Sequence, residues 1–454
     1  MSSNLAESPP VSALCDYIEA VGGSVFLPGD DDYTRARSVW NAAVDHRPAV
    51  VVRCRNADEV RLAVRAARMR NFPLSVRGGG HDWAGRALRH EGLVIDMSAM
   101  RRVRIDTETR TATVQGGATA SDIMSAAQPY GLAAVVGNCG AVGMVGLTLG
   151  GGYGPLTPRY GLALDNLLSA DVVLHDGSIV TADAKNHTDL FWALRGGGGN
   201  FGVVTSMRIR LHPVGEVLAG VILFPWSQAR SVLQGFGRVM QTAPDDLSAV
   251  AVLIPAQNGE PLLLLAPVWT GERAAGQAAL EPLRSLATPI HENLAAISYG
   301  ELLSLYDSNV VSGRSYAVET RWLSQLSPEA IAVIAACGAR RTSRLSMIAM
   351  HHFHGAGTRV ATTDTAFGLR SPHFMVEIVA SWEDNDRAVH QGWARHLSNQ
   401  LKPFALPGGY ANFLAPDAHE QIASAYGVNA ERLKSLKGRF DPAAVFTSAI
   451  PLPV

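Results

Sequence analysis

The chain has 454 residues, of which 47% are hydrophobic and 17% are charged, and its formal net charge is −1. This composition can fill a large core and excludes a disordered polyelectrolyte, and the nearly neutral charge gives no indication of a nucleic-acid partner. At ~150 residues per domain, the length allows two or three domains. Glycine is the unusual residue, because 23 of the 44 glycines fall between residues 78 and 202. That segment must need backbone without side chains at many positions.

The cysteines and the N-terminal segment give information about the environment of the protein. Four cysteines stand far apart and form no C-x-x-C pair: Cys15, Cys54, Cys139 and Cys337. This spacing argues against a disulfide framework and against a structural zinc site. Residues 1–17 contain neither the basic nor the apolar region of a secretory signal, so we expect a cytoplasmic protein.

One segment could be mistaken for a membrane span, because residues 123–158 carry no charge. Its glycines recur every few residues and are followed by Pro155, which suits a lipid-exposed helix poorly. We therefore expect a buried, glycine-rich loop after residue 131 and no membrane association.

The predicted elements of the first half are short strands and helices. Short apolar runs predict strands at residues 49–54, 73–77, 93–97 and 203–211. Alternation predicts a hairpin that pairs 102–106 with 111–115, and a turn signal at 175–177 predicts one that pairs 170–174 with 178–181. Apolar residues at helical spacing predict helices at residues 58–70, 118–130 and 189–194.

Glycines become rare from about residue 213, and longer elements follow. Helices are expected at residues 227–242, 272–286, 327–335 and 431–442, and strands at 249–254, 261–268, 345–354 and 373–382. This alternation indicates a second α+β unit.

Two local patterns are ambiguous. Residues 197–202 satisfy G-x-G-x-x-G, but a helix precedes them and a strand follows, which is the reverse of a dinucleotide-binding turn. The alternative that the protein is a nicotinamide-dependent dehydrogenase rests on this reversed motif. In the strand at 345–354, His352 and His354 should share one face and His351 the other. We favour lining of a substrate cavity or strand packing over a metal site there.

The strongest signals are two glycine-rich segments about 60 residues apart. The first, Arg77-Gly-Gly-Gly-His81-Asp82, follows a strand, and successive amides in such a turn form an anion-binding nest. The second, residues 137–154, would let a planar ligand contact the backbone closely. Tight turns packed on a core could explain either segment alone, but the two together indicate a nucleotide-like ligand.

These segments resemble the berberine-bridge-enzyme-like flavoproteins of the vanillyl-alcohol-oxidase superfamily. The resemblance covers nearly the whole chain and rests on VRGGGHDWAGRAL (76–88), the stretch 137–166, LFWALRGGGGNFGVVT (190–205) and the stretch 410–446. It implies a two-domain α+β protein with a PCMH-type FAD-binding fold. Residues 1–210 and 408–454 would bind FAD, and residues 211–407 would form an inserted substrate domain, an antiparallel sheet covered by helices.

The resemblance also implies how FAD is held. His81 matches the residue that bonds to the flavin 8α-methyl, and Cys139 matches the one that forms a thioether at flavin C6, so a bicovalent FAD is expected. Gly140 follows where a proline is common in the family. The further cofactor contacts implied are Arg77, Gly78, Gly79, Gly80, Asp82, Gly137, Asn138, Gly143, Gly146, Gly151, Gly202, Val203 and Asn412.

The implied reaction is hydride transfer from a bulky alcohol, sugar or natural product to the flavin, with O2 as acceptor and H2O2 as product. Val142 matches the residue that admits O2. Tyr410 and Glu377 are the candidate catalytic residues, although Tyr410 could instead orient the substrate and Glu377 could form a buried ion pair. The substrate would be lined by Tyr153, His352 and His354.

Alternatives stay open at this point. The same scaffold could cyclise an aromatic natural product or oxidise a C–N bond, in keeping with a role in secondary metabolism. A flavin-binding protein without turnover is a more distant alternative. Either a monomer or a homodimer would suit the chain.

Overall fold

The structure is a computed structural model that describes residues 24–256, 259–307, 310–447 and 449–452. Cys15 and the segment considered above as a secretory signal lie outside the described residues. Within them, the other three cysteines are buried and free of disulfides. No helix in the described ranges has the length and apolarity needed to cross a bilayer.

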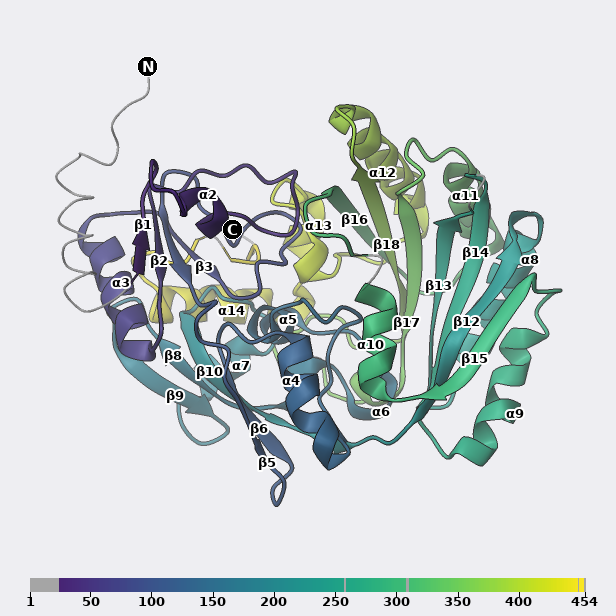
Figure 1. Cartoon of the computed structure of the whole chain (residues 1–454), viewed down its shortest axis with the longest axis horizontal. Helices are drawn as coiled ribbons and strands as arrows, with labels where there is room; N and C mark the ends of the chain where they lie inside the picture. The colour runs from purple at the N-terminus through teal and green to yellow at the C-terminus, as the bar shows by residue number, and fades with distance from the viewer. Residues whose placement is uncertain (1–23, 257–258, 308–309, 448, 453–454) are drawn as a thin grey trace.

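The first half of the chain forms two larger sheets (Figure 1), besides a two-stranded pairing of β7 (Leu132–Ala133) with β11 (His212–Pro213). A four-stranded sheet has the order β1 (Ser24–Phe26), β2 (Val50–Arg53), β4 (Leu93–Asp96), β3 (Leu74–Arg77). An antiparallel sheet has the order β5 (Val103–Asp106), β6 (Thr111–Gln115), β10 (Val203–Arg210), β8 (Leu167–Val173), β9 (Ile179–Asp183). Helix α3 (Ala57–Met69) links β2 to β3 and packs between the sheets, because it contacts β4 on one side and β8 and β10 on the other.

The second half forms one seven-stranded antiparallel sheet. Its order is β15 (His291–Ile297), β12 (Val217–Pro225), β14 (Pro261–Trp269), β13 (Leu247–Pro255), β17 (Met347–Phe353), β18 (His373–Trp382), β16 (Ser315–Leu323). One side of this sheet is covered by helices α8 (Ala229–Gln241), α9 (Arg273–Arg284), α11 (Pro328–Ala339) and α12 (Arg387–Leu401), because their buried residues share one apolar cluster with its strands (Figure 1).

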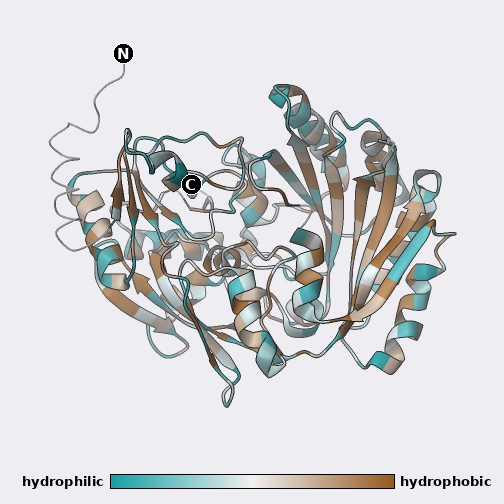
Figure 2. Ribbon diagram, viewed as in Figure 1, coloured by the Kyte–Doolittle hydropathy of each residue, from teal (hydrophilic) through white to brown (hydrophobic). Residues whose placement is uncertain are grey.

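Side chains alternate between the two faces of this sheet, and Figure 2 shows that much of the length of its strands is hydrophobic. Apolar residues therefore occur on both faces. On β17, Ile348 and Met350 join the core beneath the helices. Their neighbours Met347 and Ala349 face the other way, toward the first half of the chain. The helix-covered face therefore stabilises the sheet and leaves the opposite face available for a ligand.

The C-terminal part of the chain returns to pack on the first half. Helix α14 (Ala430–Phe440) packs on α7 (Thr188–Leu194), and Arg432 and Arg439 both pair with Asp189. Leu433 and Leu436 are buried in the same core as β10.

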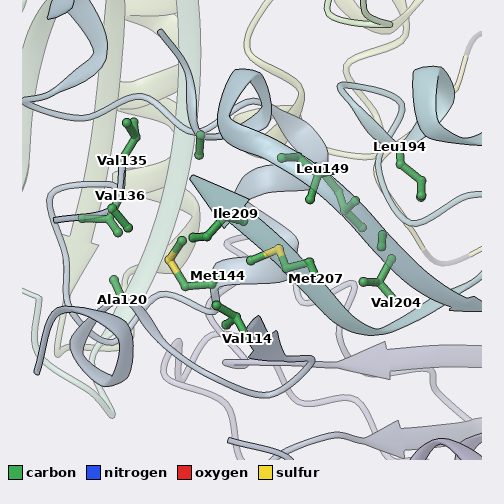
Figure 3. Packing of buried hydrophobic residues seen from close by; sticks show 14 of the residues in the cluster. Val114, Ala120, Val135, Val136, Met144, Leu149, Leu194, Val204, Met207 and Ile209 are labelled. Carbon is green, nitrogen blue, oxygen red and sulfur yellow. The ribbon is translucent and has the colours of Figure 1, made fainter. Parts of the chain in front are cut away.

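The expectation of a loop throughout residues 131–158 is wrong. After α4 (Ala120–Ala127), the chain forms a short 3-10 turn and then helices α5 (Met144–Gly150) and α6 (Thr157–Tyr160). Met144 and Leu149 of α5 belong to one buried cluster with Met207 and Ile209 of β10, and Figure 3 shows Met144 near these two residues. Tertiary packing thus stabilises a helix that its glycines disfavour.

The other predicted elements are present with shifts of a few residues at their ends. The longer elements that the sequence pattern did not predict are β12, β15, β16, α12 and α10 (Tyr299–Asp307). They lie in the second half, where apolar residues are frequent on both faces and the periodic signal is weak. The short elements β1, α2 (Tyr33–Ala36), β7 (Leu132–Ala133), β11 (His212–Pro213) and α13 (His419–Ser424) were also missed.

Candidate functional site

A cavity of about 850 Å³ lies between the glycine-rich loops and the face of the seven-stranded sheet that is opposite the helix-covered one. It extends from Leu74 and Ser75 of β3, past both glycine-rich loops, to the strands β13, β14, β17 and β18. Every element of the site described below borders this cavity or supports a residue that does.

The two glycine-rich loops are in direct backbone contact. A Cβ atom on Gly79 would lie 2.4 Å from the amide nitrogen of Gly143, and one on Gly143 would lie 2.5 Å from that of Gly79. Only glycine fits on both sides of such a contact. The loop after β3 and the loop before α5 are thereby held against each other.

This contact brings the two predicted attachment residues together. His81 Nε2 lies 3.8 Å from Cys139 Sγ, and both residues line the cavity. The indole of Trp40 stacks on the His81 ring, with centroids 4.2 Å apart. Burial lowers the pKa of His81 to about 4 and raises the pKa of Cys139 to about 11. At neutral pH the pair is therefore a neutral imidazole beside a thiol.

A residue from the second half of the chain holds the Cys139 loop. Asp307, at the end of α10, accepts a hydrogen bond from the Gly140 amide at 2.7 Å. A Cβ atom on Gly140 would lie 2.2 Å from Ser121 Oγ. A proline here would add that Cβ and remove the donor. The structure thus explains why glycine occupies this position, and the Asp307 charge further raises the pKa of Cys139.

Tyr410 is fixed by two hydrogen bonds. Its hydroxyl oxygen accepts from the Gly152 amide at 2.9 Å and from Asn412 Nδ2 at 2.8 Å. Burial raises the pKa of Tyr410 to about 12, so this side chain is a neutral phenol at physiological pH.

Tyr153 lies against the Tyr410 ring at a centroid distance of 4.8 Å. Its hydroxyl is 3.0 Å from His373 Nε2, and His373 Nδ1 is 2.8 Å from the Ser371 carbonyl oxygen. The carbonyl requires a proton on Nδ1, so Tyr153 donates its hydrogen bond to Nε2. Burial lowers the pKa of His373 to about 4, which keeps this ring neutral.

Four strands of the sheet give the cavity a mainly apolar wall that carries one ionisable pair. The strands β13, β14, β17 and β18 contribute Val250, Val252, Ile254, Leu264, Ala266, Met347, Ala349 and Met375. Between them, His351 Nε2 lies 3.3 Å from Glu377 Oε2.

Most of the predicted site residues line this one cavity. They are Tyr410, Glu377 and Val142; His81, Cys139, Gly78, Gly79, Gly80, Asp82, Gly137, Asn138, Gly143, Gly146, Gly202, Val203 and Asn412; and Tyr153.

Two predicted cofactor contacts lie elsewhere. The Arg77 guanidinium donates to the Ala36 carbonyl and approaches Asp96, away from the cavity. Gly151 packs against the rings of Tyr410 and Phe367.

The prediction that His352 and His354 line the cavity requires correction. They do share a face, with their Nδ1 atoms 3.1 Å apart, and neither lines the cavity described above, although His352 borders a small adjoining pocket together with Tyr153. His352 packs on Phe374 of the core, and His354 Nε2 contacts the Leu247 carbonyl. Strand alternation puts His351 on the cavity side instead.

The sequence interpretation missed His351, Asp307, Trp40 and Ser75. His351 could have been found by extending the alternation of Met347 and Ala349 by one step. The other three depend on long-range packing, which leaves no local signal.

Comparison with known proteins places this geometry in a family. Residues 48–183 match the FAD binding domain family, and residues 409–453 match the family described as berberine and berberine like. The FAD-linked oxidoreductase YvdP of Bacillus subtilis (strain 168), itself called uncharacterized, is 30% identical over 93% of this chain and 96% of its own. The chain belongs to the berberine-bridge-enzyme-like family of FAD-linked oxidoreductases.

Solved structures of the family share the whole fold. 6-Hydroxy-D-nicotine oxidase from Arthrobacter nicotinovorans superposes with a TM-score of 0.86 at 27% identity, over 95% of this chain and 98% of that one. Xylooligosaccharide oxidase from Myceliophthora thermophila C1 gives 0.85 at 25% identity, over 97% and 99%. The fold is therefore the PCMH-type FAD-binding fold, and the protein is an FAD-linked oxidoreductase that acts on small molecules.

The residues around the cavity fit an FAD. Among the described residues, the amides of Gly78, Gly79 and Gly80 have no protein acceptor, and Ser75 Oγ is buried without a partner. A buried hydroxyl is normally hydrogen-bonded, so Ser75 Oγ and the glycine amides would suit a ligand with acceptor groups. A Cβ on Gly146 would meet no protein atom within 4 Å, so this glycine leaves space in the cavity itself.

We expect the Cys139 thiol of the cofactor-free protein to be slow to alkylate. The thiolate is the reactive form, and the pKa of about 11 means that its fraction rises about tenfold per pH unit up to that value. Iodoacetamide labelling followed by peptide mass spectrometry measures this profile, with Cys139→Ala as the blank. In Asp307→Asn the profile should level off at lower pH, because the negative charge is removed. A wild-type rate that levels off near the ordinary thiol pKa of about 8.5 would contradict the assignment.

Proposed function

We propose that the protein is an oxidase that carries FAD bound covalently through His81 and Cys139, oxidises a bulky small molecule and reduces O2 to H2O2. The observation that supports it most is the 3.8 Å approach of His81 to Cys139 within the cavity. These side chains come from loops 58 residues apart, and both end in atoms that can attack an electron-poor ring.

We further propose which parts of the chain hold each ligand. FAD would occupy the part formed by residues 1–210 and 408–454, held by the glycine-rich loops, Ser75 and Asn412. The substrate would enter against residues 211–407. Bound FAD supplies a hydride acceptor and passes the electrons on to O2.

The protonation states suit this role. His81 is neutral at pH 7, because burial lowers its pKa to about 4, so a ring nitrogen can act as a nucleophile. Cys139 must lose its proton before its sulfur reacts. Val142 borders the cavity next to this loop, and we propose that its small side chain leaves a path for O2.

We propose that Glu377 accepts a proton from the substrate as general base and that Tyr410 orients the substrate. Glu377 is the carboxylate of the sheet wall. The pKa of Tyr410, about 12, is too high for a base at neutral pH. Its oxygen already accepts two hydrogen bonds, which leaves its proton to donate to a substrate.

The names of relatives support an oxidase. They include (R)-6-hydroxynicotine oxidase of Paenarthrobacter nicotinovorans, 33% identical over 63% of this chain, and the xylooligosaccharide oxidase described above. The cytoplasmic location, the role in secondary metabolism and the choice between monomer and homodimer stay predictions.

Acid precipitation tests the covalent linkage. The wild-type pellet should stay yellow, and the Cys139→Ala and His81→Ala pellets should each keep colour through the remaining bond, because either bond alone retains the flavin. The double variant should release all flavin to the supernatant. Cys337→Ala is the matched control, since this buried cysteine lies outside the cavity. A colourless wild-type pellet would exclude covalent FAD.

Anaerobic stopped-flow tests the assigned roles with any substrate that reduces the wild type. Glu377→Gln should slow flavin reduction by about 10²–10⁴-fold, the usual contribution of a general base. Tyr410→Phe should slow it by well over tenfold while FAD stays bound. An unchanged reduction rate in either variant removes that residue from the mechanism.

A further inference from the structure

We propose that the substrate is a mainly apolar, ring-containing molecule with one hydrogen-bond-donating group, a phenol hydroxyl or a protonated amine, beside the carbon that is oxidised, and that it is not an oligosaccharide. This inference rests on the proposed function and specifies its substrate.

The first observation is the aliphatic character of the wall. Val250, Val252 and Ile254 of β13 stand beside Leu264 and Ala266 of β14, and Ala349 of β17 continues the row. Aliphatic side chains bind apolar rings by burying area and offer no partner to a hydroxyl. A sugar would lose water from many hydroxyls here without gaining hydrogen bonds in return, which weakens binding.

The second observation is how few polar groups this wall carries. Besides the His351–Glu377 pair, the lining residues of the second half include Asn293 on β15 and Arg314. Arg314 Nε is bound to Glu383 Oε1 at 3.0 Å. One concentrated polar point on an apolar surface matches a ligand with one polar end.

The third observation is the charge balance at that point. Glu377 is 10% exposed at its side chain, and in the described part of the chain its ion-pair partner is His351, not a lysine or an arginine. A carboxylate buried with so little compensation favours a ligand that donates a hydrogen bond or brings a positive charge.

The opposite side of the same region is aromatic. Tyr410 and Glu377 line the same cavity, and the Tyr153 ring adjoins that of Tyr410. A ring of the substrate can stack there, and an ammonium group would be attracted by the ring faces.

His351 acts as a positioning residue. With its Nε2 proton directed to Glu377, it restrains the carboxylate on the wall and leaves the remaining acceptor sites of Glu377 for the substrate.

The test measures ligand binding to the flavin-loaded protein without turnover. Binding is detected under anaerobic conditions as a change in the flavin absorbance spectrum. The probes are para-phenylphenol, para-phenylbenzylamine, the methyl ether of the phenol, and xylobiose. The phenol or the amine should bind about tenfold or more tightly than the methyl ether, as expected for a hydrogen bond to a charged group. Whichever binds more tightly identifies the donor. Xylobiose should give no saturable change.

Variants locate the effect. In Glu377→Gln and in His351→Phe, the phenol or the amine should bind little more tightly than the methyl ether. In His351→Gln the difference should be close to that of the wild type, because the glutamine amide can still donate a hydrogen bond to Glu377. Glu319→Gln is the matched control, since Glu319 lies on the neighbouring strand β16 and pairs with Arg395 outside the cavity. Val252→Asn should weaken all three biphenyls and keep the preference.

Two results would overturn the inference: saturable xylobiose binding tighter than that of the biphenyls, or equal binding of the phenol, the amine and the ether. Both leave the proposed function intact, because the flavin spectrum is recorded before any ligand is added. A protein isolated without flavin would instead refute the proposed function itself.

Discussion

The backbone of Gly79 lies directly against that of Gly143, with no space for a side chain on either. This contact joins the loop after β3 to the loop before α5, and so brings His81 and Cys139, 58 residues apart, to 3.8 Å. Asp307 of α10 adds a hydrogen bond to the Cys139 loop from the second half of the chain. The cavity, the pairing of the two nucleophiles and their burial all follow from this close approach.

The alternation of side chains along a β-strand is the second constraint, because it separates the residues that stabilise the sheet from those that line the cavity. One face of the seven-stranded sheet supports the fold through its packing with helices, while the other can vary in chemistry. Glu377 can therefore sit as a carboxylate on a strand whose neighbours Val376 and Ile378 belong to the core. The same division limits what the cavity can bind, because the wall around Glu377 is aliphatic.

Much of this organisation could be predicted from the sequence, and the failures have physical causes. Most strands of the first half and both glycine-rich loops were predicted because their signals are local, whereas the very short strands β1 and β7 (Leu132–Ala133) were missed. Helix α5 was missed because its glycines and lack of charge hide the helical period, and packing against β10 stabilises it. His351 was passed over for His352 and His354, although the local alternation of the strand separates them: the pattern assigns two faces, and only long-range packing decides which face borders the cavity. Asp307 and Ser75 left no signal for the same reason.

The most direct test of the account compares two variants in which a glycine is replaced by alanine. For each variant, thermal unfolding is measured on the cofactor-free protein, and the flavin content is measured after reconstitution with FAD. Gly79→Ala should destabilise the protein without any cofactor, by about 1–3 kcal/mol, because its Cβ meets backbone. Gly146→Ala should unfold at the same or a higher temperature, since alanine favours the helix, yet bind less FAD, because its Cβ enters the cavity. Equal stability of Gly79→Ala and the wild type, or full flavin loading of Gly146→Ala, would contradict it.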